Sequence, residues 1–515
     1  MRRRTQYRML VLPVLLGSFS LAAFSGLFES IAIAQAAAAA PPSPFKQKPI
    51  TLKDKELTEK GIEKTKAIKP DRSDVAPIQQ YYNGFLIPLL TTQNSPEYVN
   101  KARMDISNDI VTIETNKALS PKFNAVLIEL LKELVMRGAD GSVYSPQCRI
   151  NAMVLLGKLN SEVTTTSSKP EANVQGILLR VLDEKGNDGL LSSALSILTR
   201  HLKYKGGAAK GPPVFAVSEK GSGLFVDKLK VFLTAPAPVY RDPDAHNYLK
   251  EQVIECLTLI ADNDPNKEPS KLAAAALTPA LVKILDEQES EWLVEKALWS
   301  FGTVKSHNLT PEDVLVVEKA IAKFTIQSLR DWKKRIANSG AIGGMGGGYP
   351  GGDMGGVSGM PGGMSGEGGD GGYGGMPGAN RAVSPYAKQP KEVKNARRIA
   401  HQRFERIHVA LNGVFYTLKP LTTESKEKAK APSAEKGLLA LLSENAKEKE
   451  KVIELLTAIE QFQADLNDFK VIDLSSLSTV VSKSIRGMRE ATEQILGDAK
   501  DEATKEPADG VFGSP

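Results

Sequence analysis

The chain has 515 residues, of which 41% are hydrophobic and 6% aromatic, a composition typical of globular helical domains rather than of general disorder. Its formal net charge is +6, but residues 1–34 contain four arginines and one glutamate, so the remainder carries only +3. So small a charge on so long a chain excludes a general electrostatic argument for nucleic-acid binding.

The N-terminal segment predicts export. Arginines at positions 2, 3, 4 and 8 precede an apolar run over 9–28, and Ala32-Ile33-Ala34 offers a small-residue cleavage site. This is the layout of a secretory signal peptide, here residues 1–34. The alternative is an uncleaved membrane anchor, because the run approaches the ~20 residues that span a bilayer. We therefore expect a periplasmic or cell-envelope protein, membrane-anchored if the signal is retained.

The next segments differ sharply in composition. Residues 35–74 are rich in proline, lysine and glutamate and predict a disordered polar leader. Over residues 75–337, apolar positions recur at spacings of three and four, which predicts amphipathic helices. Four helix starts are expected where a hydroxyl residue precedes proline. They are Ser120-Pro121, Ser145-Pro146, Thr278-Pro279 and Thr310-Pro311.

Within 75–337 a pattern of three positions recurs at separations of 42, 59 and 44 residues. The sets are Ala152, Leu156, Leu159; Ala194, Leu198, His201; Val253, Leu257, Ile260; and Ala297, Phe301, Val304. Each set follows a shorter apolar helix, and helix pairs with a period of ~40–47 residues are typical of HEAT or armadillo repeats. The long interval contains an insertion, residues 203–223, expected to form a loop.

Two stretches carry a resemblance to a known family. CRINAMVLLGKL (148–159) and WLVEKALWSFGTV (292–304) resemble the second helix of HEAT repeats, and Arg149 matches the family's frequent arginine. The resemblance implies an all-α fold built as a HEAT-like α-solenoid over 75–337. An irregular helical bundle is the alternative.

The C-terminal third begins with low complexity. Residues 338–384 are rich in glycine and methionine and predict a flexible linker with a root-mean-square span of roughly 35 Å. Amphipathic stretches in 385–500 predict a small helical bundle, and 501–515 a disordered tail. On this interpretation the C-terminal module searches for a partner independently of the repeats.

Candidate chemistry is sparse. Gly346, Gly348 and Gly351 satisfy G-x-G-x-x-G without the strand and helix that the nucleotide motif needs. The methionines of the same run are soft ligands for Cu(I), but no histidine or cysteine lies near them. Two cysteines, Cys148 and Cys256, are expected to be buried free thiols. No cofactor is predicted.

Two small constellations have a functional and a structural interpretation. Asp242, Asp244 and His246 form D-x-D-x-H, which suits either a metal site or the capping of a helix. Lys394, Arg397 and Arg398 share one face of a helix, which suits either binding of a polyanion or anionic membrane or an ordinary solvated surface.

These patterns together favour an exported, non-catalytic helical-repeat scaffold that binds a protein partner in the cell envelope. Export combined with the Gly/Met-rich run also resembles envelope proteins of planctomycete-type bacteria. One alternative is an envelope hydrolase or metal-dependent enzyme with a site near residues 203–247. The other is polyanion or membrane-surface binding through the basic C-terminal helix, and no specific nucleic acid is expected.

Overall fold

The computed structural model describes residues 45–69, 72–93, 95–138, 141–164, 167–184, 186–206, 214–287, 290–305, 307–342, 391–413, 436–466 and 474–497. The chain divides into two compact units, residues 1–46 and 47–515. All helices and strands described below belong to the second unit. The predicted signal peptide, the linker beyond residue 342 and the tail 501–515 lie outside the described residues.

The fold is all-α, as predicted. The N-terminal helices are α1 (Asp54–Ala67), α2 (Ala76–Tyr81), the π-helix η2 (Tyr82–Leu86), α3 (Ile87–Leu90) and α4 (Pro96–Glu114). Next come α5 (Ser120–Val135), α6 (Pro146–Leu156), the 3-10 helix η3 (Ala172–Val174), α7 (Gln175–Val181), α8 (Asp188–Lys203), α9 (Glu219–Thr234), α10 (Pro243–Asn263), α11 (Glu268–Glu287) and α12 (Glu291–Thr303). The chain then forms α13 (Pro311–Ile342), α14 (Lys391–Asn412), α15 (Leu438–Leu441), α16 (Ala446–Leu466) and α17 (Leu474–Leu496).

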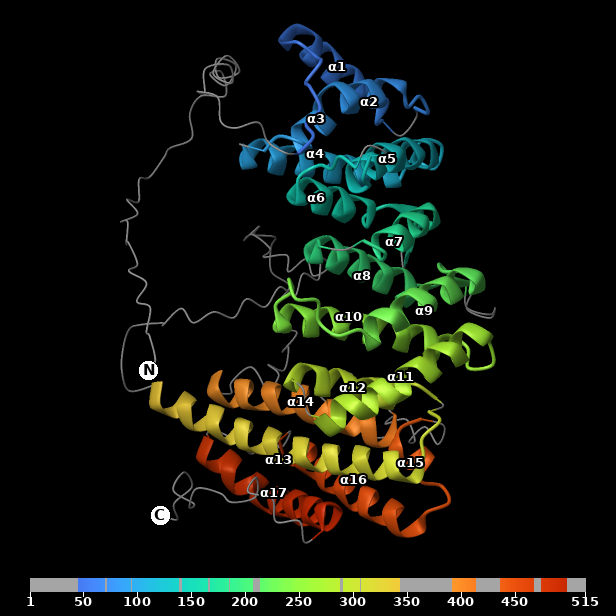
Figure 1. Cartoon of the computed structure of the whole chain (residues 1–515). Coiled ribbons are helices and arrows are strands. Elements are labelled where there is room, and N and C mark those ends of the chain that lie inside the picture. The colour runs from blue at the N-terminus through green and yellow to red at the C-terminus, as the bar shows by residue number, and fades with distance from the viewer. Residues whose placement is uncertain are drawn as a thin grey trace, which may run out of the picture. The chain divides into compact units, whose positions relative to one another are not determined.

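The helices contact one another in two ordered columns (Figure 1). In the even column α6, α8, α10, α12 and α14 pack one after another. In the odd column α7, α9, α11 and α13 do the same, and α17 packs on α13. Within a pair, α5 packs on α6, α7 on α8, α9 on α10 and α11 on α12. Each helix therefore buries its apolar face against its pair mate and the helices before and after it in its column.

The repeated pattern in the sequence marks the core of the even column. Its four sets fall on or directly after α6, α8, α10 and α12, and all twelve side chains are at most 2% exposed. His201, which departs from the apolar pattern, is buried like the leucines around it. The spacing of four and then three residues keeps the three members of each set on one helix face. The prediction of four helix pairs is confirmed, but the first helix is not always the shorter one, because α5 (16 residues) is longer than α6 (11 residues) and α11 (20 residues) is longer than α12 (13 residues).

The helix-start predictions were partly correct. Ser145 accepts a hydrogen bond from the Cys148 backbone N–H and caps α6. Thr310 and Asp313 form a reciprocal capping pair at the start of α13, with Thr310 N donating to Asp313 Oδ2 at 2.9 Å and Asp313 N donating to Thr310 Oγ1 at 3.2 Å. Ser120 is itself the first residue of α5 and makes no capping bond.

The expected start at Thr278-Pro279 is wrong, because Pro279 lies inside α11. Proline within a helix removes one backbone hydrogen bond and costs ~3 kcal/mol. On either side of it, Leu277 and Leu281 are fully buried, and burial of two leucines recovers a comparable free energy. Thr278 Oγ1 also donates to the Ala274 carbonyl at 2.9 Å. Tertiary packing therefore stabilises α11 despite the proline in its interior.

The prediction of a disordered leader over 35–74 is wrong for residues 54–67, which form α1. Its sequence is almost uniformly polar, so its support comes from the neighbouring helices rather than from its own apolar face. Lys64 Nζ contacts Asp109 of α4 at 2.7 Å, and the Tyr82 hydroxyl donates to the same carboxylate at 2.9 Å. A partly buried ion pair that is anchored by a tyrosine explains why this charged segment is ordered.

The prediction of an independent C-terminal module is also wrong. The Trp332 indole N–H of α13 donates to the Ala396 carbonyl of α14 at 2.9 Å. Phe462 of α16 packs against both Trp332 and Phe404, with ring centroids 5.2 and 4.9 Å apart. At Gly302, α12 approaches α14 so closely that no side chain fits. Helices α14–α17 therefore continue the packed series, and α13 extends five residues into the segment 338–384.

Three smaller findings complete the fold. Two short antiparallel hairpins, β1–β2 (Asn160–Val163 with Ser168–Pro170) and β3–β4 (Lys205–Gly206 with Val214–Phe215), interrupt the helices, the second within the expected insertion loop. Cys148 and Cys256 are buried and free, as predicted. In the part of the chain that the structure describes, no helix is long and apolar enough to cross a membrane.

Candidate binding pocket between α10 and α12

The metal-site interpretation of Asp242, Asp244 and His246 is not supported by their positions. Asp242 is the N-cap of α10, and its Oδ1 accepts from the backbone N–H groups of Asp244 and Ala245 at 2.9 and 3.3 Å. His246 is buried and its Nδ1 lies 3.2 Å from Arg241, whereas both aspartates are exposed. Among the described residues no group of three potential ligands could hold a metal ion. The capping interpretation is confirmed for Asp242.

The three basic residues proposed to bind a polyanion do not form one exposed surface. Lys394 and Arg398 are exposed on α14, but Arg397 is only 5% exposed. Another arginine of the same helix, Arg403, is nearly buried and pairs with Glu291 of α12 and, at 3.3 Å, with Asp331 of α13. Arg403 therefore joins α14 to the two preceding helices.

The histidines that would be natural acid–base groups mostly serve packing. Burial lowers the pKa of both His201 and His307 to about 4. His307 stacks near Phe301, with ring centroids 4.6 Å apart, and its Nδ1 lies 3.0 Å from Thr278 Oγ1. Both imidazoles are therefore neutral at physiological pH and enclosed in the helix interfaces.

A surface cavity of about 280 Å³ among the described residues, called here the α10–α12 pocket, is lined by two helices of the even column. Asp244, Asn247, Tyr248 and Glu251 line it from α10. Ser290, Glu291 and Trp292 line it from the start of α12. Ser290 caps that helix by accepting from Leu293 N at 3.3 Å, which fixes where the first turn of α12 begins. Asp244, one of the residues singled out in the sequence, therefore reaches a site, although not a metal site.

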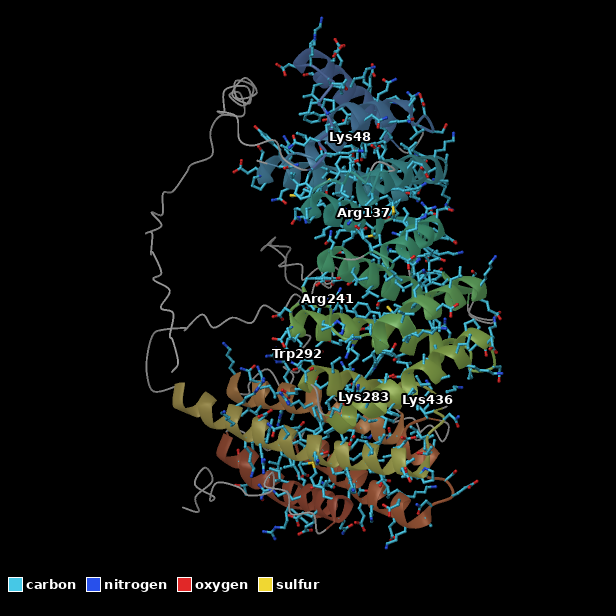
Figure 2. The ribbon with its side chains drawn as sticks, viewed as in Figure 1. Lys48, Arg137, Arg241, Lys283, Trp292 and Lys436 are labelled. Atoms are coloured by element: carbon cyan, nitrogen blue, oxygen red, sulfur yellow. The ribbon has the colours of Figure 1, made fainter. Side chains whose placement is uncertain are left out.

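Two aromatic side chains of this pocket are solvent-exposed. Trp292 is 66% exposed and Tyr248 is 38% exposed. Trp292 lies at the edge of the helix series, on the same side of the view as Arg241 (Figure 2). The Tyr248 hydroxyl accepts from Gln252 at 3.2 Å, and Gln252 also donates to Ser196 of α8 at 3.3 Å. The Tyr248 hydroxyl is thus bonded within α10 to a glutamine that also reaches α8, while Trp292 is presented to solvent.

The position of Trp292 follows from the phase of α12. Its buried stripe contains Leu293, Ala297 and Phe301, so Trp292 falls beside that stripe. Trp299 lies two turns later on the same face as Trp292, but it is almost buried, with Lys296 Nζ 5.1 Å from its ring centroid. One face of α12 therefore carries one covered and one uncovered tryptophan.

The pocket lining is acidic. It contributes three carboxylates, those of Asp244, Glu251 and Glu291, and no basic side chain. Burial raises the pKa of neighbouring Glu295, and the charges of Glu291 and Glu251 raise it further, against the opposing effect of Arg403. Two of the three lining carboxylates already have cationic partners, since Glu291 pairs with Arg403 and Glu251 pairs with Lys296.

Sequence reasoning missed Tyr248 and Trp292. The available signal was the position of Trp292 beside, rather than on, the apolar stripe of a helix whose pattern was otherwise recognised. A large aromatic ring outside the buried face is a stronger indication of binding than one within it. No protein-family model matches the chain, and no curated protein matches it in sequence.

Proposed function

We propose that the chain is an exported, non-catalytic scaffold of HEAT-like helical repeats that binds a protein partner in the cell envelope. The observation that carries the proposal is the exposed Trp292–Tyr248 pair at the α10–α12 pocket, set on a series of packed helices. Tryptophan and tyrosine are enriched among residues that dominate binding energy at protein interfaces. Their exposure to solvent is best explained by a partner that covers them.

The arrangement of helices supports an α-solenoid. Pairs α5/α6 to α11/α12 stack so that each contacts its neighbours, and α13 to α17 close the series. Architectures of this kind present extended surfaces for binding. Export rests on the arginine-led apolar run and small-residue exit of residues 1–34.

Crosslinking followed by affinity purification of the tagged full chain from its own cell envelope tests this function. We expect a specific protein whose crosslinks map to α10 and α12. An unrelated exported protein of similar size, carrying the same tag, is the control. Recovery of the same proteins with both baits would contradict the scaffold proposal, and recovery of the chain from the cytoplasm would contradict export.

A further inference from the structure

The walls of the α10–α12 pocket have the chemistry that recognises a cation. Exposed rings of Trp292 and Tyr248 provide π faces, and tryptophan is the best of the aromatic residues at attracting a cation. Lys296 already makes such a contact with Trp299 on the same face of α12, at 5.1 Å from the ring centroid. Trp292 presents the same kind of ring to a partner.

The charges around the pocket also favour binding of a cation. They comprise the three lining carboxylates, two further carboxylates that each share a cationic partner with one of these, and three cations. The carboxylates are Asp244, Glu251, Glu255, Glu291 and Asp331, and the cations are Lys203, Lys296 and Arg403. Two negative charges remain in excess within this set. The N-termini of α10 and α12 offset about one of them, since each helix dipole contributes roughly half a positive charge.

The size of the pocket limits what can enter. Its volume of about 280 Å³ is just below the ~300–1,000 Å³ of pockets that hold drug-sized ligands. One long side chain suits this space better than a larger organic molecule. Its acidic lining disfavours an anionic lipid surface.

We propose that the α10–α12 pocket takes a lysine or arginine side chain from an extended basic segment of the partner protein. The inference rests on the proposed scaffold function and adds the chemistry of the partner. The cationic head lies over the Trp292 ring and among Asp244, Glu251 and Glu291, while its alkyl stem packs on Tyr248. Long cationic side chains commonly bury their stems on apolar surface in this way.

Fluorescence anisotropy with the full chain tests the proposal directly. The probe is a fluorescein-labelled decapeptide of alternating lysine and glycine, and the matched probe has glutamine in place of every lysine. We expect saturable binding of the lysine peptide at low salt, at least 10-fold tighter than the glutamine peptide. Binding should weaken as salt rises, because the excess charge is solvent-exposed.

Variants of the chain locate the binding. Trp292→Ala and Asp244→Asn should each weaken binding of the lysine peptide by roughly 5- to 30-fold. Tyr98→Ala and Asp227→Asn are matched controls, since both side chains are exposed on other helices, α4 and α9. The controls should change the affinity by less than 2-fold. Thermal unfolding of each variant confirms that all four remain folded.

Equal binding of the two peptides, or equal effects of the pocket and control variants, would overturn the proposal. So would a concentration-dependent dimer that disappears in Trp292→Ala, because the pocket would then be an interface between two copies of this chain. These outcomes are separable from failure of the scaffold function. A partner crosslinked at α10 and α12 through a neutral or acidic segment would sustain the scaffold and refute the basic-segment inference.

Discussion

Gly302 is the position at which the packing of the C-terminal helices is most easily tested. It lies near the end of α12, and a Cβ built there would be 2.1 Å from the Val409 carbonyl oxygen of α14 and 2.3 Å from its carbonyl carbon. Both are backbone atoms, so a rotamer change cannot relieve the clash. The same oxygen accepts from Gly413 N at 2.7 Å, at the end of α14. Gly302→Ala must therefore move one helix relative to the other.

The expected cost follows from two opposing effects. Overpacking a tight interface costs typically about 1–3 kcal/mol. Alanine regains up to about 1 kcal/mol of helix propensity relative to glycine. We expect a net destabilisation of about 1–2 kcal/mol. Gly223 in α9 is the matched control, because a Cβ there meets nothing within 4 Å. Gly223→Ala should therefore be stabilising by about 0.5–1 kcal/mol.

Hydrogen exchange measured by mass spectrometry is the appropriate assay, because it resolves individual helices. Gly302→Ala should speed exchange in α12 and α14 and leave α4 to α6 unchanged, while Gly223→Ala should slow or preserve exchange in α9. If Gly302→Ala behaves like Gly223→Ala, the close approach of α12 and α14 does not exist, and the independent C-terminal module is restored.

Three further predictions concern buried groups. Arg149 donates to the Val135 carbonyl at 2.8 Å and to both oxygens of Glu184. Arg149→Met should therefore lower the free energy of chemical unfolding by about 1–3 kcal/mol. Arg137 contacts the same glutamate from its exposed side, so Arg137→Met should lower it much less. Burial, together with the neighbouring Glu448, raises the pKa of Glu318 to about 7. Because the unfolded chain releases this proton near pH 4.5, the free energy of unfolding should fall as the pH rises from about 4.5 to about 7. Glu318→Gln should remove that fall and add up to about 3 kcal/mol to the free energy of unfolding at pH 8. Burial raises the pKa of the Cys148 and Cys256 thiols to about 12, so a thiol reagent at pH 8 should label them only after unfolding, and rapid labelling of the native chain would contradict their burial.

The sequence predicted the repeated core because periodic burial leaves a periodic pattern. Ala152, Ala194, Val253 and Ala297 begin four sets that are all buried, and capping chemistry placed the starts of α6 and α13 correctly. These features are local, and local spacing on one helix determines which side chains share a face. The error at Pro279 shows the limit, since packing outweighed a local helix-breaking signal.

The remaining features depend on partners far along the chain. The order of α1 depends on Lys64 meeting Asp109, 45 residues away, and the docking of α14 depends on Trp332 reaching Ala396, 64 residues away. Neither pairing can be predicted from the composition of the segments involved. The same holds for the pocket: Asp244 belongs to a short pattern in the sequence, but Trp292 joins it only because α10 and α12 pack together.

The most direct test of the account replaces Asn247, which lines the α10–α12 pocket and takes no part in the proposed contacts, with a photoreactive phenylalanine analogue in the native host and irradiates intact cells. We predict a single major protein adduct at this position, and no adduct when the same analogue replaces Val231, which is 63% exposed on α9 in the odd column. Adducts of equal yield from both positions, or none from position 247, would contradict a scaffold that binds its partner through the α10–α12 pocket.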